Sequence, residues 1–205
     1  MSGRAKNVSF VDRLKIVYRP YICPFDDLIN ELNDQPARVM DIGCGSGQFC
    51  LLLAEFSKVK AIKGIEVSQQ LVDNANALLS PYNNRIQTDF KFYNGSDIPD
   101  DTASYDTIFL IDVLHHVPRK LQESFLASIY SKMSKGSTLL LKDINAASPL
   151  VVFNKIHDTV FSREIGNERS LQAVSALAKQ IGFTIESVKT KTLYVYPHYL
   201  IRLRK

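Results

Sequence analysis

The chain has 205 residues and carries 25 Lys and Arg against 21 Asp and Glu, which gives a formal net charge of +4. A chain of this length can bury one sizeable core, and its composition, 45% hydrophobic and 22% charged, is that of a globular domain. The basic residues are scattered along the sequence. Such weak basicity disfavours nucleic acid as a partner, since nucleic-acid binding requires a concentrated positive surface.

The cysteine content points to a reducing compartment. Cys23, Cys44 and Cys50 are too few for a disulfide framework, and no Cys-x-x-Cys or His-x-x-x-His pair offers the spacing of a metal site. The first residues lack the apolar core of a secretory signal, and no apolar stretch approaches the ~18 residues that a membrane span needs. We therefore expect a cytoplasmic location, no membrane span and no bound metal.

Apolar periodicity predicts strands that alternate with helices along most of the chain. Helices are expected over residues 26–32, 48–56, 69–79 and 119–133, and strands over 38–42, 60–67, 90–93, 107–111 and 138–142. Alternation of this kind is typical of a parallel sheet that is covered by helices on both faces. The last part differs, because after a helix over 170–181 the strands expected over 184–193 and 198–204 have no helix between them. These two strands should form an antiparallel hairpin.

A glycine-rich loop follows the first expected strand. Asp41 precedes glycines at alternate positions, Gly43, Gly45 and Gly47, and such glycines let the backbone turn tightly and approach a ligand. The segment resembles the D-x-G-x-G-x-G loop by which class I methyltransferases hold S-adenosylmethionine (SAM). The resemblance extends from about residue 38 to residue 205.

The resemblance implies a Rossmann-like, doubly wound α/β fold with a seven-stranded, mostly parallel sheet and an antiparallel last strand. It also implies a single class I methyltransferase domain over residues 1–205. Its parts would be N-terminal cap helices (1–35), a SAM-binding core (36–147), a substrate lid (148–169) and the last helix with its hairpin (170–205).

A dinucleotide is the rival ligand for this loop. Its fingerprint is G-x-G-x-x-G, but the third glycine position falls on Gln48 or Cys50, depending on the register. Asp41 would also repel a pyrophosphate, whereas it would attract the ammonium and sulfonium groups of SAM. These features favour SAM over a nicotinamide or flavin cofactor.

Further cofactor residues follow the next two strands. Glu66 lies about 20 residues beyond the loop, where an acidic side chain accepts hydrogen bonds from ribose hydroxyls. Asp97 resembles the family residue that contacts the adenine amino group, although it also suits an ordinary turn. The cofactor-binding residues expected are Asp41, Gly43, Cys44, Gly45, Gly47, Glu66, Val67, Ser96, Asp97, Ile98, Asp112 and Tyr18.

The segment before the core offers a cover for the cofactor. In this family N-terminal extensions often fold over the cofactor, so that Tyr18, Arg19 and Tyr21 would close the pocket. An aromatic-rich helix packed on the sheet edge is the alternative.

The acceptor is expected to bind at the carboxyl ends of the strands. There, Leu114-His115-His116 is similar to methyltransferases of small molecules and lipids, such as those of quinone biosynthesis, and lacks the Pro-Pro-aromatic signature of nucleic-acid amino methylases. An imidazole titrates near neutral pH and suits a general base. The catalytic candidates are His116, Asp143, His157 and His198, and each histidine has a structural role as its alternative.

The stretch 148–169 is long for a simple crossover and has apolar residues at helical spacing. It is expected to form a substrate lid with His157 facing inward, the alternative being an amphipathic helix packed on the core. The sequence thus predicts a SAM-dependent methyltransferase that acts on a small-molecule or lipid-like acceptor, and it leaves the oligomeric state open. The alternatives are an RNA or protein methyltransferase and a SAM-binding module without catalysis.

Overall fold

The computed structural model describes residues 23–32, 37–153, 155 and 166–205. Its centre is a seven-stranded sheet with the strand order β3-β2-β1-β4-β5-β7-β6. The strands are β1 (Arg38–Ile42), β2 (Ala61–Glu66), β3 (Gln87–Phe92), β4 (Thr107–Ile111), β5 (Thr138–Ile144), β6 (Thr184–Leu193) and β7 (Tyr196–Arg204). The helices are α2 (Phe25–Asn30), α3 (Gln48–Phe56), α4 (Gln69–Leu79), α5 (Gln122–Lys132) and α7 (Leu171–Ile181), with 3-10 turns η1 (Ser80–Tyr82), η2 (Asp100–Ser104) and η3 (Leu114–His116).

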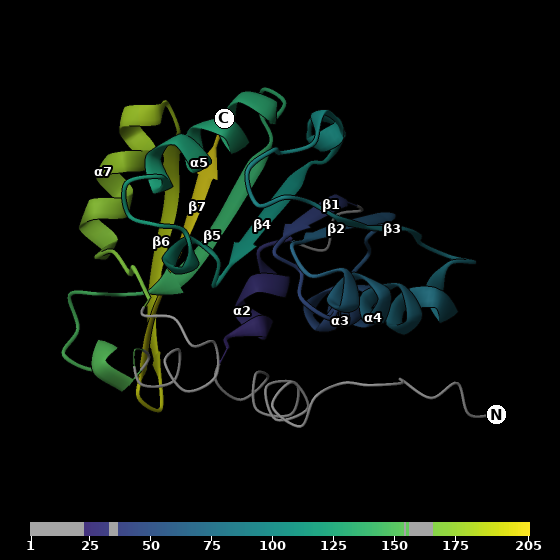
Figure 1. The fold of residues 1–205 in the computed structure, drawn as a ribbon, viewed down its shortest axis with the longest axis horizontal. Helices are drawn as coiled ribbons and strands as arrows, with labels where there is room; N and C mark the ends of the chain where they lie inside the picture. Colours follow the sequence, from purple (N-terminus) through teal and green to yellow (C-terminus); the bar gives the residue numbers. More distant parts are fainter. Residues whose placement is uncertain (1–22, 33–36, 154, 156–165) are drawn as a thin grey trace.

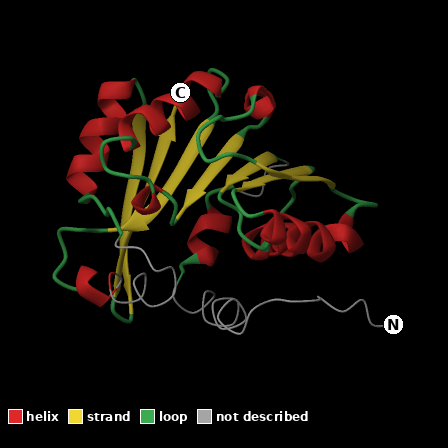
Figure 2. Cartoon of the chain, in the orientation of Figure 1, coloured by secondary structure: helices red, strands yellow, loops and turns green. Residues whose placement is uncertain are grey.

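Helices cover both faces of this sheet (Figures 1 and 2). On one face α2, α3 and α4 pack in one hydrophobic cluster, and on the other face α5 and α7 pack in a second cluster. Alternate strand residues supply the two clusters, since Val39 belongs to the first, and Met40 and Ile42 to the second. This alternation explains why the central strands are almost continuously apolar. The predicted doubly wound α/β fold is confirmed.

The strand directions also agree with the prediction. β1, β2, β3, β4 and β5 pair in parallel, whereas β7 pairs antiparallel with both β5 and β6. In the β5–β7 register Asp143 lies opposite Tyr199, and Ile144 lies opposite His198. The start of β7 therefore lies at the edge where the parallel strands end, called the carboxyl edge below.

Local sequence signals set the helix ends. Ser68 caps α4, because its hydroxyl accepts a hydrogen bond from the Leu71 N–H, and Ser170 caps α7 in the same way through the Ala173 N–H. Gly182 follows α7 with φ +117, a left-handed conformation that ends helices.

Several boundaries differ from the sequence prediction, and three of the differences have a clear cause. β3 starts at Gln87 instead of residue 90, because its first residues are polar and lie in a strand at the sheet edge, where the apolar signal is weak. β5 runs on to Ile144 and so contains Asp143, a charged residue that has hydrogen-bond partners there. α5 begins at Gln122, three residues later than expected, after a turn in which the Leu121 N–H donates to the Pro118 carbonyl.

Within the described ranges, no helix is both long enough and apolar enough to cross a membrane.

Candidate cofactor and acceptor site

The glycine loop joins β1 to α3 in a conformation that requires glycine. Gly43, Gly45 and Gly47 have φ values of +77, +55 and +82°, in the left-handed region that other residues rarely adopt. Space is limited as well, because a Cβ on Gly43 would lie 2.4 Å from Cγ2 of Val113. The Gly43 N–H donates to the Ile65 carbonyl over 2.8 Å, which ties the loop to the end of β2.

Glu66 connects this loop to the start of α4. Its Oε2 accepts a hydrogen bond from the Gly45 N–H at 3.0 Å, and its Oε1 accepts from the N–H groups of Val67 at 2.8 Å and Ser68 at 3.2 Å. The carboxylate therefore lies directly beside the glycine loop at the carboxyl edge. This is the position expected of the ribose-binding acid.

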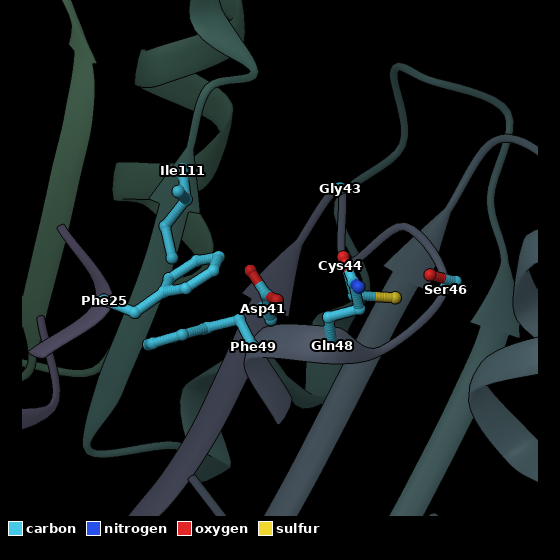
Figure 3. A pocket seen from close by; sticks show the side chains of 8 residues that line it. All are labelled: Phe25, Asp41, Gly43, Cys44, Ser46, Gln48, Phe49 and Ile111. Atoms are coloured by element: carbon cyan, nitrogen blue, oxygen red, sulfur yellow. The ribbon is translucent and has the colours of Figure 1, made fainter. Parts of the chain in front are cut away.

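Asp41 lies under the loop, beside a small cavity of about 10 Å³. Its carboxylate is buried and accepts a weak hydrogen bond from the Cys50 thiol, whose Sγ lies 3.6 Å from Oδ2. Burial, together with the negative charge of Asp41, raises the pKa of the Cys50 thiol well above its ordinary value. Figure 3 shows the carboxylate of Asp41 between the aromatic rings on one side and the glycine loop on the other. The cavity is lined by Phe25, Asp41, Gly43, Cys44, Ser46, Gln48, Phe49 and Ile111.

The turn after β3 is organised by Asn94. Its Oδ1 accepts hydrogen bonds from the N–H groups of Ser96 and Asp97, and its Nδ2 donates to Oδ2 of Asp97 over 2.6 Å. Ser96 and Asp97 are exposed, whereas Ile98 is buried. The adenine contact of Asp97 stays a prediction, and the turn supplies an exposed carboxylate for it.

Asp112, a predicted cofactor-binding residue, follows β4 and has φ +55°. Its contact with the cofactor stays a prediction. A left-handed aspartate is uncommon, and backbone strain of this kind often marks a functional site. The ammonium of Lys142, on the neighbouring strand β5, donates to both carboxylate oxygens of Asp112 at 2.6 and 2.7 Å. The side chain of Lys142 is only 1% exposed and that of Asp112 is 22% exposed, so this is a partly buried ion pair.

Next to this ion pair lies a buried pair, His115 with Asp143. His115 Nδ1 is 2.5 Å from Oδ1 of Asp143, and the His115 N–H donates to Oδ2 of the same residue over 3.1 Å. Oδ1 also accepts from the Ile144 N–H at 2.7 Å. Both side chains are almost fully buried. The sequence-based candidates include Asp143 and His116 but not His115, because nothing local distinguishes two adjacent histidines.

The other histidine candidates lie around this pair. His116 is exposed, and its ring centroid lies 4.1 Å from that of His115. His198 is buried at the start of β7, with its ring stacked at 6.3 Å on that of Tyr196. Burial, followed by the charges of Asp143 and Asp112, raises the pKa of the neighbouring Tyr199 well above its ordinary value.

A buried glutamine, which sequence reasoning missed, anchors the end of the expected lid. Gln122 Nε2 donates to the carbonyls of Leu114, Val117 and Asn167 at 2.9 to 3.0 Å. Arg169 in turn donates to Oε1 of Gln122. The chain at 166–169 is thereby fixed against the turn that carries His115.

Some expected site residues lie outside the described residues: Tyr18, Arg19, Tyr21 and His157. Of the lid stretch, the structure describes residues 148–153, 155 and 166–169. Their proposed roles stay predictions.

A family of methyltransferase domains matches this chain over residues 18–188. Among curated proteins, the O-methyltransferase resE of Aspergillus sclerotiorum is 30% identical over 106 residues, which are 52% of this chain and 39% of that protein. The arsenite methyltransferase of Rattus norvegicus is 25% identical over 178 residues, 82% of this chain and 47% of that protein. The chain thus spans less than half the length of these relatives.

A solved structure has the same fold. The crystal structure of magnesium protoporphyrin IX methyltransferase from Synechocystis with bound SAH superimposes with a TM-score of 0.70 and 18% identity, covering 97% of this chain and 89% of that one. The match over residues 18–188 covers most of the chain and includes both the glycine loop and the acceptor side. The chain therefore belongs to the methyltransferase-domain family, with the class I fold and with S-adenosylmethionine as the family's cofactor.

Proposed function

We propose that this chain transfers the methyl group of SAM to a hydroxyl oxygen of a small organic or lipid-like acceptor, with His115 as the general base. The observation that carries the proposal is the 2.5 Å contact between His115 Nδ1 and Asp143 Oδ1 at the carboxyl edge. A base is needed only where the nucleophile still holds its proton, as a hydroxyl group does.

The cofactor side fits SAM. Asp41 offers a buried negative charge beside the glycine loop, which suits the positive charges of SAM. Glu66 offers carboxylate oxygens for ribose beside the left-handed glycine loop. When bound, SAM supplies a methyl carbon activated by its sulfonium, and the carbon–sulfur bond breaks as the carbon–oxygen bond forms.

The hydrogen bonds of Asp143 define what His115 can do. An ionised carboxylate only accepts hydrogen bonds, so the proton of the neutral imidazole resides on Nδ1 and its basic position is Nε2. Nε2 takes the hydroxyl proton as the methyl group is transferred. Asp143 fixes the orientation of the ring and stabilises the imidazolium that forms.

Asp143 therefore acts as a positioning residue in this proposal, because three hydrogen bonds already occupy its oxygens. His116 and His198 flank the pair, and they remain competing candidates for the base together with His157. An acceptor with a hydroxyl group is also supported by the relative from Aspergillus sclerotiorum, which is named an O-methyltransferase.

The test is methyl transfer from isotope-labelled SAM to phenols and aliphatic alcohols, each paired with the amine of the same carbon skeleton. Mass spectrometry identifies the atom that gains the label, and RNA and peptide mixtures are assayed in parallel. We expect the label on oxygen. Label on nitrogen, RNA or peptide would contradict the acceptor class, and SAM binding without turnover on any of these would favour the non-catalytic module.

Variants of the histidines then identify the base. His115→Gln should lower kcat by about 10²- to 10⁴-fold, the usual contribution of general acid–base catalysis, while SAM affinity stays at the wild-type value. His116→Gln and His198→Gln should have smaller effects. Full turnover by His115→Gln, with loss in either of the other two, would move the role to that histidine.

A further inference from the structure

The acceptor side contains a group of side chains with the composition of a metal site. Asp112, His115 and Asp143 each bring one ligand-type atom, and these three atoms lie within 4.8 Å of one another. Carboxylate and imidazole groups at such distances are ligands that divalent cations commonly take. The question is what provides the positive charge among them in this protein.

The side chain of Lys142 places a positive charge beside this group. The ammonium of Lys142 lies 2.6 and 2.7 Å from the two oxygens of Asp112, the same atoms that a metal ion would coordinate. Lys142 is 1% exposed and pairs in the β4–β5 register with Ile111, so its strand position directs it toward Asp112. An ammonium and a divalent ion cannot share these oxygens, because like charges at that distance repel strongly.

We propose that Lys142 is the resident cation of this group and occupies the place of a metal ion, thereby positioning Asp112 at the mouth of the acceptor site. Asp112 has a strained left-handed backbone, and its N–H donates to the Lys142 carbonyl at 2.9 Å. The ion pair and this backbone bond together hold the Asp112 carboxylate in one orientation. Strain at a single residue persists where surrounding contacts fix it in this way.

The Asp112 carboxylate compensates for the burial of the ammonium, because both of its oxygens accept a hydrogen bond from Lys142 Nζ. The inference concerns Asp112 and Lys142 and holds whichever acceptor the site takes.

The experiment removes the ammonium and asks whether a metal takes its place. Lys142→Met keeps a side chain of similar length without charge, and Mn²⁺ binding is followed by electron paramagnetic resonance of the purified full chain. We expect the wild type to bind Mn²⁺ more weakly than about 1 mM, the weak end of protein calcium sites. Lys142→Met should gain one Mn²⁺ site that binds at least about tenfold more tightly, and the double variant Lys142→Met with Asp112→Asn should lose that site again.

Lys63→Met is the matched control. Lys63 is also a buried lysine, with its ammonium 2.5 Å from Asp101 and 3.4 Å from Asp89, but among the described residues no third ligand joins that pair. It should gain no comparable Mn²⁺ site. A folded Lys142→Met protein without a gain in Mn²⁺ affinity would overturn the proposal.

Mn²⁺ binding by the wild type is a second test of the proposal, which is needed if Lys142→Met does not fold. Stoichiometric Mn²⁺ binding by the wild type that Asp143→Asn abolishes would show that a metal shares the group with Lys142, and would overturn the proposal. Retention of SAM affinity in excess EDTA, with only weak Mn²⁺ binding, would support it. Neither readout requires turnover, so failure here is distinguishable from failure of the proposed hydroxyl chemistry.

Discussion

The two sides of the carboxyl edge are built by different means. On the cofactor side, at the ends of β1 and β2, the site consists mainly of backbone: left-handed glycines, and a carboxylate that accepts from three N–H groups. On the expected acceptor side it consists of charged side chains, in which residues after β4 pair with residues of β5. One sheet edge is thus built from local backbone shape in one part and from charged pairs between residues distant in sequence in the other.

Gly43→Ala should break the cofactor side with the largest effect. The added Cβ would lie 2.4 Å from Val113 Cγ2 at a φ of +77°, so the loop has to move. The left-handed penalty of about 1–2 kcal/mol and the overpacking cost of about 1–3 kcal/mol together predict a loss of about 100-fold in SAM affinity, measured by calorimetric titration.

Gly136→Ala is the control for that substitution. Gly136 has a similar φ of +84°, but its added Cβ would meet nothing within 4 Å. It should lower the free energy of unfolding by about 1–2 kcal/mol and leave SAM affinity unchanged. Equal SAM affinities in both variants would mean that the shape of the glycine loop does not hold the cofactor.

The alkaline pH dependence of stability should separate the two sides. The pKa of Cys50, beside Asp41, is raised in the folded chain, whereas an unfolded cysteine ionises near about pH 8.5. Above that pH the folded state binds more protons than the unfolded state, so stability falls by up to about 1.4 kcal/mol per pH unit for this group. Cys50→Ala should remove this part of the pH dependence of stability. Denaturant unfolding at about pH 8 and about pH 10, on either side of the unfolded pKa, measures it.

Tyr199 provides the corresponding group on the acceptor side. Its pKa is also raised by burial, but an unfolded tyrosine ionises only near about pH 10. Tyr199→Phe should therefore change the pH dependence of stability above about pH 10, and below that pH the dependence should be that of the wild type. If Cys50→Ala keeps the wild-type pH dependence of stability below about pH 10, the dependence in that range does not come from Cys50.

The smallest effect is expected away from both sides. Ser170→Ala removes the hydroxyl that accepts from the Ala173 N–H at the start of α7. Loss of such a cap costs about 1 kcal/mol of unfolding free energy. SAM affinity should not change, and a fall in affinity would show that the cofactor side depends on α7.

The sequence predicted the cofactor side better than the acceptor side for a physical reason. The conformations of Gly43, Gly45 and Gly47 depend on residues that are close in the sequence, so a short motif can predict them. His115 and Asp143 are 28 residues apart, and Asp112 and Lys142 are 30 residues apart. Only the pairing of β4 with β5 brings them together, so no local motif points to Lys142 or distinguishes His115 from His116.

The same distinction holds for the fold. The alternation of apolar strands and helices predicted the sheet and the final hairpin, because burial on both faces leaves a strong apolar pattern. The first residues of β3 were missed, since a polar strand at the sheet edge has no such pattern. The role of Gln122 was missed because one of its three carbonyl partners, Asn167, lies 45 residues away in the sequence.

The position of β7 between β5 and β6 has a consequence for how the protein is made. During synthesis both neighbours emerge before β7 does, so each presents an unpaired edge until the ribosome has delivered residues 196–204. Unpaired edges can pair with other chains and so promote aggregation of the nascent protein. Lys189 and Lys191, which pair with Glu31 and Asp27 in the folded chain, place charge on β6, and charged side chains on an unpaired strand disfavour pairing with other chains.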